Sequence, residues 1–345
     1  MTQSIALQDL LVAAGHELVA VMIGKSPRRE IPGFYYAKIK APISTFESPN
    51  FILDKGGRSI KVFSSISHNL KKNKTFLKNL EEIDRHVKEY KPDVIVNFYD
   101  LLCGLYFLNY KPKVKHVTIA HQYLLPHPHF ETPRGKWRDK QFMALNNGLT
   151  SFRADKRLAL SFREMSHLPK LKTFVVPPLL RQEVKDSVTE NKDFLLTYVL
   201  NEGYGSDIIK WHEQKKNVEV HGFWDRKDVE NEYKPHENIT FHKLNDKKFL
   251  DCMKSCRAYA STSGFESICE AMFLGKPVML VPTGGHFEQE CNAIDAVKAG
   301  AGVASKTFDL QVLLDYLPTH VSRQEEFKKW ALQADEIFLK YMEEW

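Results

Sequence analysis

Short apolar runs alternate with amphipathic stretches along most of the chain. Runs of strand length that are followed by segments of helical spacing are typical of βαβ units, in which helices connect parallel strands. The pattern therefore predicts an α/β fold built on parallel sheets. In the second half, strands are expected at 195–200, 218–221, 239–242, 258–260 and 277–281, and helices at 206–213, 246–256, 265–274 and 288–298.

The first half shows the same alternation less regularly. A helix is expected at 5–14 and strands at 18–23, 94–98 and 114–120, with a Lys-rich amphipathic stretch at 63–90. The pattern opens directly with a helix, whereas a doubly wound domain normally opens with a strand and a glycine-rich turn. The pattern therefore lacks the first strand, and we expect the true start to lie upstream.

The regular pattern stops near residue 178, where two prolines follow a strand-like run. The polar stretch 179–192 comes next and is typical of a linker. The sequence thus predicts one domain over 1–178 and a second domain over 193–321. A charged helix is expected over 322–345, packed back on the first domain.

Composition excludes several classes of protein. With 345 residues, 43% of them hydrophobic, 17 Gly and 16 Pro, the chain is neither disordered nor collagen-like. The apolar stretch 94–110 is interrupted by polar residues and is too short to cross a bilayer. Five scattered cysteines do not suggest a disulfide framework, so a cytoplasmic location is expected.

The net charge of +6 is unevenly distributed, because basic residues are in excess in the first half and acidic residues in the second. A basic domain could contact an anionic acceptor or a phospholipid surface. Basic and aromatic residues are interleaved over 134–172, and such a segment could make peripheral contact with the anionic inner face of a membrane or hold a phosphorylated acceptor; a solvated surface is the alternative. Nucleic acid is not expected as a partner, since no zinc-finger or RNA-recognition pattern is present.

The most informative segment is the turn from the fourth expected strand of the second half into its helix. The first amides of such a helix are unsatisfied, and together with the helix dipole they favour an anion. Ser263, Gly264 and Ser267 could surround phosphate oxygens. Glu266 and Glu270 lie about one turn apart, and a carboxylate there could accept both hydroxyls of a ribose. A capped helix with surface glutamates is the alternative.

A second segment, 282–293, repeats this arrangement after the next expected strand. Two glycines turn the chain, and the following helix begins with Glu288 and Gln289. Their side chains could hydrogen-bond vicinal hydroxyls of a sugar. Capping of the helix is the alternative for this polar pair.

Together these two segments resemble the donor half of GT-B glycosyltransferases. The shared pattern is Ser-Gly-x-x-Ser-x-x-Glu-Ala, then Gly-x-Pro-Val-x-x-Val-Pro, then Glu-Gln-x-x-Asn-Ala, and it occupies 263–293. It is similar to the MurG-like N-acetylglucosaminyltransferases of peptidoglycan synthesis and to the UDP-glycosyltransferases. The resemblance implies two Rossmann-like, doubly wound domains that face a cleft. The domain over 1–178 would bind the acceptor, and the domain over 193–321 would bind the nucleotide-sugar.

The resemblance also implies how a UDP-sugar would be held. Glu270 would bind the ribose, the turn before it the diphosphate, and the pair that opens the next helix the donor sugar. Leu244 would meet uracil through its backbone, and the loop with Asn201 and Gly203 would be a second phosphate-facing loop. The implied donor-binding residues are Asn201, Gly203, Leu244, Ser263, Gly264, Glu266, Ser267, Glu270, Glu288 and Gln289.

Transfer needs a base that deprotonates the acceptor hydroxyl. Asp100 and His121 follow the strands expected at 94–98 and 114–120, at the strand ends where open α/β sheets bind ligands. Both are candidates, and capping of the following helix is the alternative for Asp100. No metal or other cofactor is expected, because GT-B enzymes generally stabilise the diphosphate with helix dipoles and amides.

The sequence therefore predicts a glycosyltransferase that moves a hexosyl or N-acetylhexosaminyl group from a UDP-sugar to a hydroxyl acceptor. A lipid-linked or cell-envelope saccharide is one candidate acceptor. Two alternatives stay open, a nucleotide-sugar epimerase on the same fold and a catalytically silent sugar-nucleotide-binding module.

Overall fold

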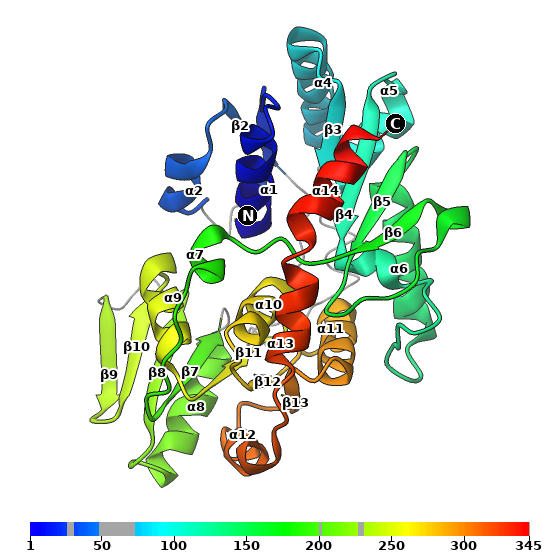
Figure 1. The fold of residues 1–345 in the computed structure, drawn as a ribbon. Helices are drawn as coiled ribbons and strands as arrows, with labels where there is room; N and C mark the ends of the chain where they lie inside the picture. Colours follow the sequence, from blue (N-terminus) through cyan, green and yellow to red (C-terminus); the bar gives the residue numbers. More distant parts are fainter. Residues whose placement is uncertain (26–30, 48–72, 200–201, 227–230, 345) are drawn as a thin grey trace.

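A computed structural model describes residues 1–25, 31–47, 73–199, 202–226 and 231–344. The chain forms two lobes, each with parallel sheet at its centre and helices on both sides (Figure 1). The α/β fold expected from the sequence is therefore confirmed. Positions 63–72, 200 and 201, which several expectations include, lie outside the described residues.

The first lobe contains two parallel sheets. A pair of strands, β1 and β2, stands apart from a four-stranded sheet of order β3-β4-β5-β6. The strands are β1 (Val21–Lys25), β2 (Ile43–Glu47), β3 (Val94–Asn97), β4 (Lys115–Ala120), β5 (Lys156–Leu160) and β6 (Thr173–Val176).

The two sheets of this lobe share their covering helices. Met22 of β1 and Ile95 of β3 pack into one apolar cluster with the buried Leu80 and Leu102 of α4 and α5. Their opposite faces meet α1, against which Val21 and Val94 pack in two adjoining clusters. Both sheets therefore lie in one layer of the lobe. The helices are α1 (Thr2–Ala13), α2 (Gly33–Lys38), α4 (Asn73–Tyr90), α5 (Leu101–Tyr110) and α6 (Trp137–Thr150).

The second lobe has one seven-stranded sheet of order β13-β12-β11-β7-β8-β10-β9. Every neighbouring pair is parallel except β9 with β10. Its strands are β7 (Phe194–Val199), β8 (Glu219–Trp224), β9 (Glu232–His236), β10 (Ile239–Lys243), β11 (Ala258–Ser261), β12 (Val278–Leu280) and β13 (Gly302–Ala304). Its helices are α8 (Glu202–Gln214), α9 (Asp246–Ser255), α10 (Phe265–Phe273), α11 (Phe287–Lys298) and α12 (Gln311–Tyr316).

The end of the chain forms two helices where the sequence suggested one. In α13 (Gln324–Ala331), Phe327 and Ala331 pack into the core of the second lobe. In α14 (Ala334–Glu343), Phe338 and Met342 pack against the sheet of the first lobe. The helix breaks between them because its apolar face must turn from one lobe to the other. Figure 1 shows the two helices in red, running from the lower lobe to the upper.

Candidate functional site

The lobes meet where strands of both sheets end. His121 follows β4, Phe162 follows β5, and Phe265 opens α10 after β11. Their rings pack together, with centroids 4.4 Å apart for His121 and Phe265 and 4.6 Å apart for Phe162 and Phe265. Thr2, at the start of α1, donates a hydrogen bond to Glu266 of α10. Open α/β sheets bind ligands at such carboxyl ends of strands, and here two sheets present theirs to each other.

The turn between β11 and α10 has the backbone features of an anion site. Gly264 is the N-cap of α10, and it has no side chain with which to cap the first amides of this helix. Ser263 has a φ of 60°, a left-handed conformation that is uncommon for a residue other than glycine. Its hydroxyl is buried and has no hydrogen-bond partner among the residues that the structure describes. Strained backbone and unsatisfied polar atoms are concentrated at functional sites.

The other polar residues at the start of α10 have partners of their own. Ser267 donates from Oγ to the carbonyl of Gly264 at 3.4 Å. Glu266 is partly exposed and accepts the hydrogen bond from Thr2. Its carboxylate complements the positive end of the α10 dipole. The sequence-predicted pair Ser267 and Glu266 therefore lies at the turn, beside the end of α1.

Glu270 lies farther along α10 and is almost completely buried. Both oxygens of its carboxylate accept hydrogen bonds from Arg181, at 2.7 Å from Nε and 3.1 Å from Nη2. Arg181 also forms an ion pair with Asp246, the first residue of α9. Burial raises the pKa of Glu270, and the guanidinium of Arg181 opposes that shift. Sequence reasoning missed Arg181, because it lies in the linker and belongs to no motif.

The turn before α11 is joined to the turn before α10. Gln289 accepts a hydrogen bond through Oε1 from the amide of Thr283 at 2.8 Å, and Asn292 donates to the carbonyl of Ser263 at 3.1 Å. Glu288 is half-buried in the first turn of α11. Burial raises the pKa of Tyr99 in the first lobe, and the charge of Glu288 raises it further. The structure therefore brings Glu288 close to the opposite lobe.

Two more of the expected donor residues follow other strands of the sheet in the second lobe. Gly203 is in the first turn of α8, which follows β7, the neighbour of β11. Leu244 follows β10 and is 43% exposed. Asn201 lies outside the described residues. Gly203 and the turn at Gly264 thus belong to adjacent strand ends.

Asp100 is the N-cap of α5. Its Oδ1 accepts a hydrogen bond from the amide of Cys103 at 3.1 Å, and its own amide donates to Oδ1 of Asn97 at 2.7 Å. Tyr99 before it has a φ of 61°. The strand and the helix are therefore joined by a tight turn, and Asp100 has the capping role that the sequence left open as the alternative.

His121 is enclosed, whereas the sequence suggested that it lines an open cleft. The ring is 3% exposed, and Nδ1 donates to the carbonyl of Leu160 at 2.7 Å. Its Nε2 lies 3.6 Å from Oδ2 of the buried Asp295, whose other oxygen pairs with Arg163 at 2.7 Å. Burial lowers the pKa of His121. The ring is covered by Phe265, so this histidine connects the lobes.

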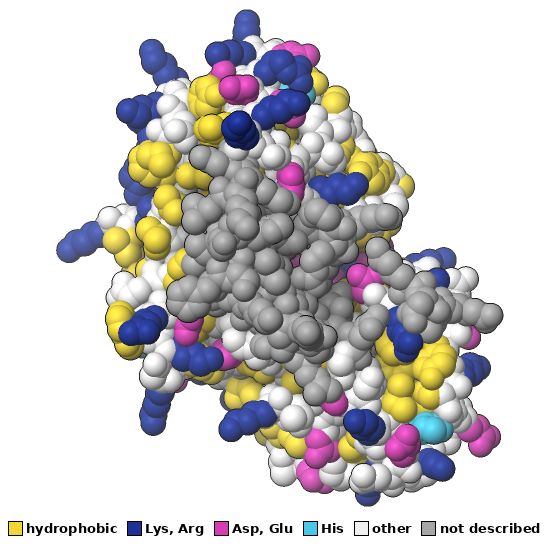
Figure 2. Space-filling model, turned by 180° about the vertical axis from the view of Figure 1, so that it is seen from behind, with side chains coloured by type: hydrophobic (Ala, Val, Ile, Leu, Met, Phe, Trp, Pro, Cys, Tyr) yellow, Lys and Arg dark blue, Asp and Glu magenta, His cyan; other side chains and the backbone are white. Residues whose placement is uncertain are grey.

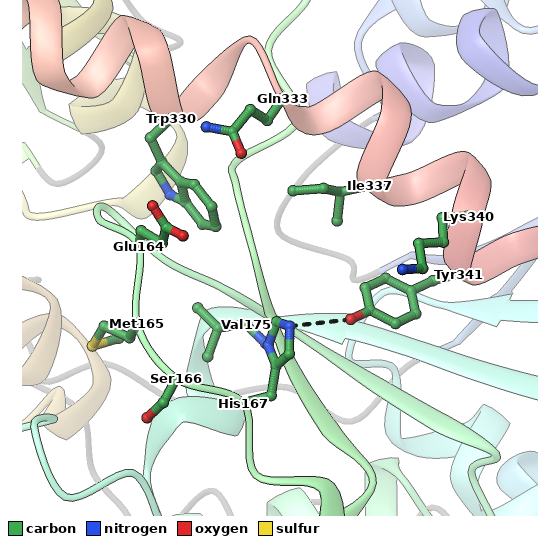
Figure 3. Close-up of a pocket in the computed structure, with 10 residues that line it drawn as sticks. All are labelled: Glu164, Met165, Ser166, His167, Val175, Trp330, Gln333, Ile337, Lys340 and Tyr341. Atoms are coloured by element: carbon green, nitrogen blue, oxygen red, sulfur yellow. Dashed lines mark hydrogen bonds between the residues drawn. The ribbon is translucent and has the colours of Figure 1, made fainter.

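A cavity of about 550 Å³ lies away from these residues, between the loop 164–167, β6 and the helices α13 and α14. Figure 3 shows His167 and Tyr341 facing each other on one side of it, with a hydrogen bond of 3.3 Å. Trp330 forms another side and donates through its indole nitrogen to the carbonyl of Ser161 at 3.0 Å. None of the sequence-predicted site residues is among those that line this cavity.

Within the described ranges, no group of three or more His, Cys, Asp and Glu side chains could hold a metal ion. In the same part of the chain, no helix combines the length and the apolar character that crossing a bilayer requires.

Comparison with known proteins places the chain in a family. Residues 9–320 match glycosyl transferase family 1. None of the curated proteins searched is significantly similar to the sequence. The solved structures that share the fold include three that match over nearly the whole length of both chains.

The glycotransferase of kitacinnamycin is 14% identical, with a TM-score of 0.63, and the match covers 98% of this chain and 94% of that one. The spinosyn forosaminyltransferase SpnP is 12% identical, with a TM-score of 0.60 and coverage of 99% and 94%. The Arabidopsis thaliana protein UGT89C1, complexed with quercetin, is 10% identical, with a TM-score of 0.61 and coverage of 99% and 96%.

Identities this low establish the fold alone, and that fold is GT-B, with two Rossmann-like domains, as the sequence suggested. The specific likeness to MurG-like enzymes stays a prediction. The family match extends over most of the chain and includes both lobes. This protein is therefore a glycosyltransferase that belongs to glycosyl transferase family 1.

Proposed function

We propose that this glycosyltransferase moves a hexosyl or N-acetylhexosaminyl group from a UDP-sugar to a hydroxyl acceptor. The observation that carries the proposal is the turn before α10. It joins a helix N-terminus whose N-cap is a glycine, a buried hydroxyl on Ser263 without a partner in the described part of the chain, and a buried carboxylate on Glu270 in one short segment. Amides, a hydroxyl and a carboxylate suit a diphosphate and its ribose.

The carboxylate of Glu270 favours a uridine nucleotide, which contains ribose, over a thymidine nucleotide, which contains deoxyribose. Structures of UGT89C1 with UDP and of the spinosyn rhamnosyltransferase SpnG with thymidine diphosphate represent both kinds. A carboxylate that accepts two hydroxyls gains one more hydrogen bond from ribose than from deoxyribose. Glu270 is such a group, so a ribonucleotide is the expected donor.

Each donor residue has a role in this proposal. Helix amides at Gly264 and the hydroxyls of Ser263 and Ser267 would stabilise charge on the leaving diphosphate, with no metal ion or other cofactor. Glu288 and Gln289 would bind the donor sugar. The backbone at Leu244 would contact uracil, Asn201 and Gly203 would form the second phosphate-facing loop, and Glu266 would border the diphosphate.

We propose Asp100 as the general base and prefer it to His121. Asp100 lies half-buried at the carboxyl end of β3, whereas the ring of His121 is covered by Phe265. A base must come within hydrogen-bond reach of the acceptor hydroxyl. His121 could do so only after the lobes move apart.

The test is binding followed by turnover. Isothermal titration should show that UDP binds and that thymidine diphosphate binds more weakly. Product analysis with UDP-glucose, UDP-N-acetylglucosamine and a membrane extract then separates three functions. A glycosyltransferase transfers the sugar to an acceptor, and an epimerase releases isomerised free sugar. A silent binding module gives no turnover. Failure to bind UDP would overturn the proposal.

We also propose that the acceptor is lipid-linked and that the first lobe docks on the cytoplasmic face of an anionic membrane. Helix α6 exposes Trp137 at 66% and Leu145 at 60%, next to the exposed Arg138 and Lys140. This helix is at the right edge of Figure 1, and Figure 2, seen from behind, shows hydrophobic and basic side chains mixed along the left edge. Such a surface suits anionic lipid headgroups.

The position of α6 would bring a membrane close to the donor sugar. Helix α6 packs against α11, and Lys136 before it forms an ion pair with Glu290. Flotation with phosphatidylcholine vesicles, with and without phosphatidylglycerol, tests the contact. Binding that depends on phosphatidylglycerol and is lost in Trp137→Ala is expected. No preference for the anionic vesicles would count against membrane docking.

A further inference from the structure

Arg181 lies in the expected linker, yet it hydrogen-bonds the carboxylate of Glu270, which we propose to bind ribose. The guanidinium is 5% exposed and meets Glu270 through two hydrogen bonds. It immediately precedes α7 (Gln182–Lys185). Two residues of α7 have partners elsewhere: Glu183 pairs with Lys38 of the first lobe, and Lys185 pairs with Asp335 of α14 at 2.9 Å. The segment with Arg181 is thus fixed to both lobes.

A buried carboxylate needs such a partner to remain charged. Burial without compensation favours the protonated form of an acid, and a protonated carboxyl group is a poorer acceptor. Ribose hydroxyls donate hydrogen bonds, so they bind best to an ionised Glu270. The cation of Arg181 favours that ionised form, since an opposite charge in contact stabilises it.

Arg181 and a ribose can use Glu270 at the same time. An ionised carboxylate offers about four lone-pair positions, and the two hydrogen bonds from Arg181 use two of them. The planar, two-point contact also fixes the rotation of the carboxylate. Asp246 forms an ion pair with the same guanidinium. The positive charge of Arg181 is therefore shared between the carboxylates of Asp246 and Glu270.

We propose that Arg181 is a positioning residue for nucleoside binding, which keeps Glu270 ionised and turned toward the two ribose hydroxyls. This inference rests on the proposed use of a UDP-sugar. It extends the donor site to a linker residue 89 positions away in the sequence from the carboxylate it supports. Besides burial, three charged groups influence the pKa of Glu270, namely Arg181, Asp246 and Glu266. Burial raises the pKa of Tyr259 and of Cys269, and the charge of Glu270 in turn raises both further.

The experiment measures uridine affinity by isothermal titration between pH 5.5 and 8.5. In the wild type, affinity should be nearly constant over this range. In Arg181→Met, uridine should bind at least ten-fold more weakly near neutral pH and recover as the pH rises, because Glu270 then loses its proton. Lys185→Met is the matched control, since it removes another cation next to the same linker helix and should leave the profile unchanged.

Two further measurements separate positioning from a general structural effect. Arg181→Lys restores a cation but not the two-point contact, so affinity should stay several-fold reduced with a flat pH profile. Binding of 2′,3′-dideoxyuridine, which lacks both hydroxyls, should not respond to Arg181→Met. If Arg181→Met does not fold, a pH-dependent loss in Arg181→Lys would overturn the inference and a flat, reduced profile would support it.

Other outcomes contradict the inference directly. Equal or tighter uridine binding by Arg181→Met would mean that the guanidinium is neutral for the ribose or blocks it. In Arg181→Met, which leaves no cation beside Glu270, a loss of the same size at every pH would mean that the residue only supports the fold. Failure of the wild type to bind UDP would instead contradict the proposed donor.

Discussion

Glu270 is the residue on which the proposed donor site depends most directly. Replacing it with Gln keeps the size of the side chain but removes the charged acceptor of the ribose hydroxyls. We expect UDP affinity to fall by the value of charged hydrogen bonds, about 1.5–3 kcal/mol. Titration calorimetry of Glu270→Gln measures this loss. The control is Glu336→Gln on the exposed side of α14, and an unchanged affinity of Glu270→Gln would remove the residue from the site.

Ser263 allows a test of the diphosphate end. Because its buried Oγ has no partner among the described residues, Ser263→Ala should hardly change the free energy of unfolding. It should weaken UDP binding by about 0.5–1.5 kcal/mol, the value of a neutral hydrogen bond, and leave uridine binding unchanged. Comparing the two ligands measures the phosphate contribution alone. Equal losses for UDP and uridine would place the hydroxyl away from the phosphates.

Asp100 combines a structural and a proposed chemical role, which two substitutions separate. Asn retains an acceptor that caps α5, whereas Ala loses the cap and should lower the free energy of unfolding by about 1 kcal/mol. If Asp100 is the base, Asp100→Asn should lose most of kcat while its Tm stays near that of the wild type. A variant Asp100→Asn with normal kcat would return the question to His121.

The elements of the second lobe are the ones that the sequence predicts best. Its central strands are buried on both faces, so they read as continuous apolar runs. In the first lobe, β1 and β2 are only half-buried and give a weaker signal. The apolar run 94–110 conceals the change from β3 to α5, which depends on the turn at Tyr99 and Asp100.

The same distinction between local and distant information applies to the site. The turns at Ser263 and Glu288 are contained in short motifs, so their positions at the lobe interface could be expected. The contacts of Arg181 with Glu270 and of Arg163 with Asp295 join residues 89 and 132 positions apart in the sequence. No local pattern encodes such pairs, because the packing of whole lobes creates them.

Buried histidines in both lobes make the stability of the molecule sensitive to acid. Burial lowers the pKa of His116 and of His242 to about 4. In the unfolded chain both groups titrate near 6.5, so between these values the unfolded state binds more protons than the native state. The free energy of unfolding should therefore be fully retained above pH 6.5 and fall as the pH drops toward 4.

Urea unfolding at pH 7.0 and 5.0 measures this dependence. We expect a loss on the order of 1–2 kcal/mol for each of the two histidines. Asn at position 116 can keep the hydrogen bond that Nδ1 of His116 makes to the carbonyl of Phe152 at 3.1 Å. His116→Asn should then show a smaller difference between the two pH values, and an unchanged difference would contradict the assignment.

Within the described ranges the chain passes between the lobes twice, once through the segment 179–192 and once at Leu332 and Gln333, where α13 gives way to α14. Two such crossings define a hinge axis, because rotation about the line through them is the easiest relative motion of the lobes. Opening of the enzyme should then follow a single hinge angle. Because Arg181 lies in the first of these crossings, rotation of the lobes should first change the contact between its guanidinium and the carboxylate of Glu270.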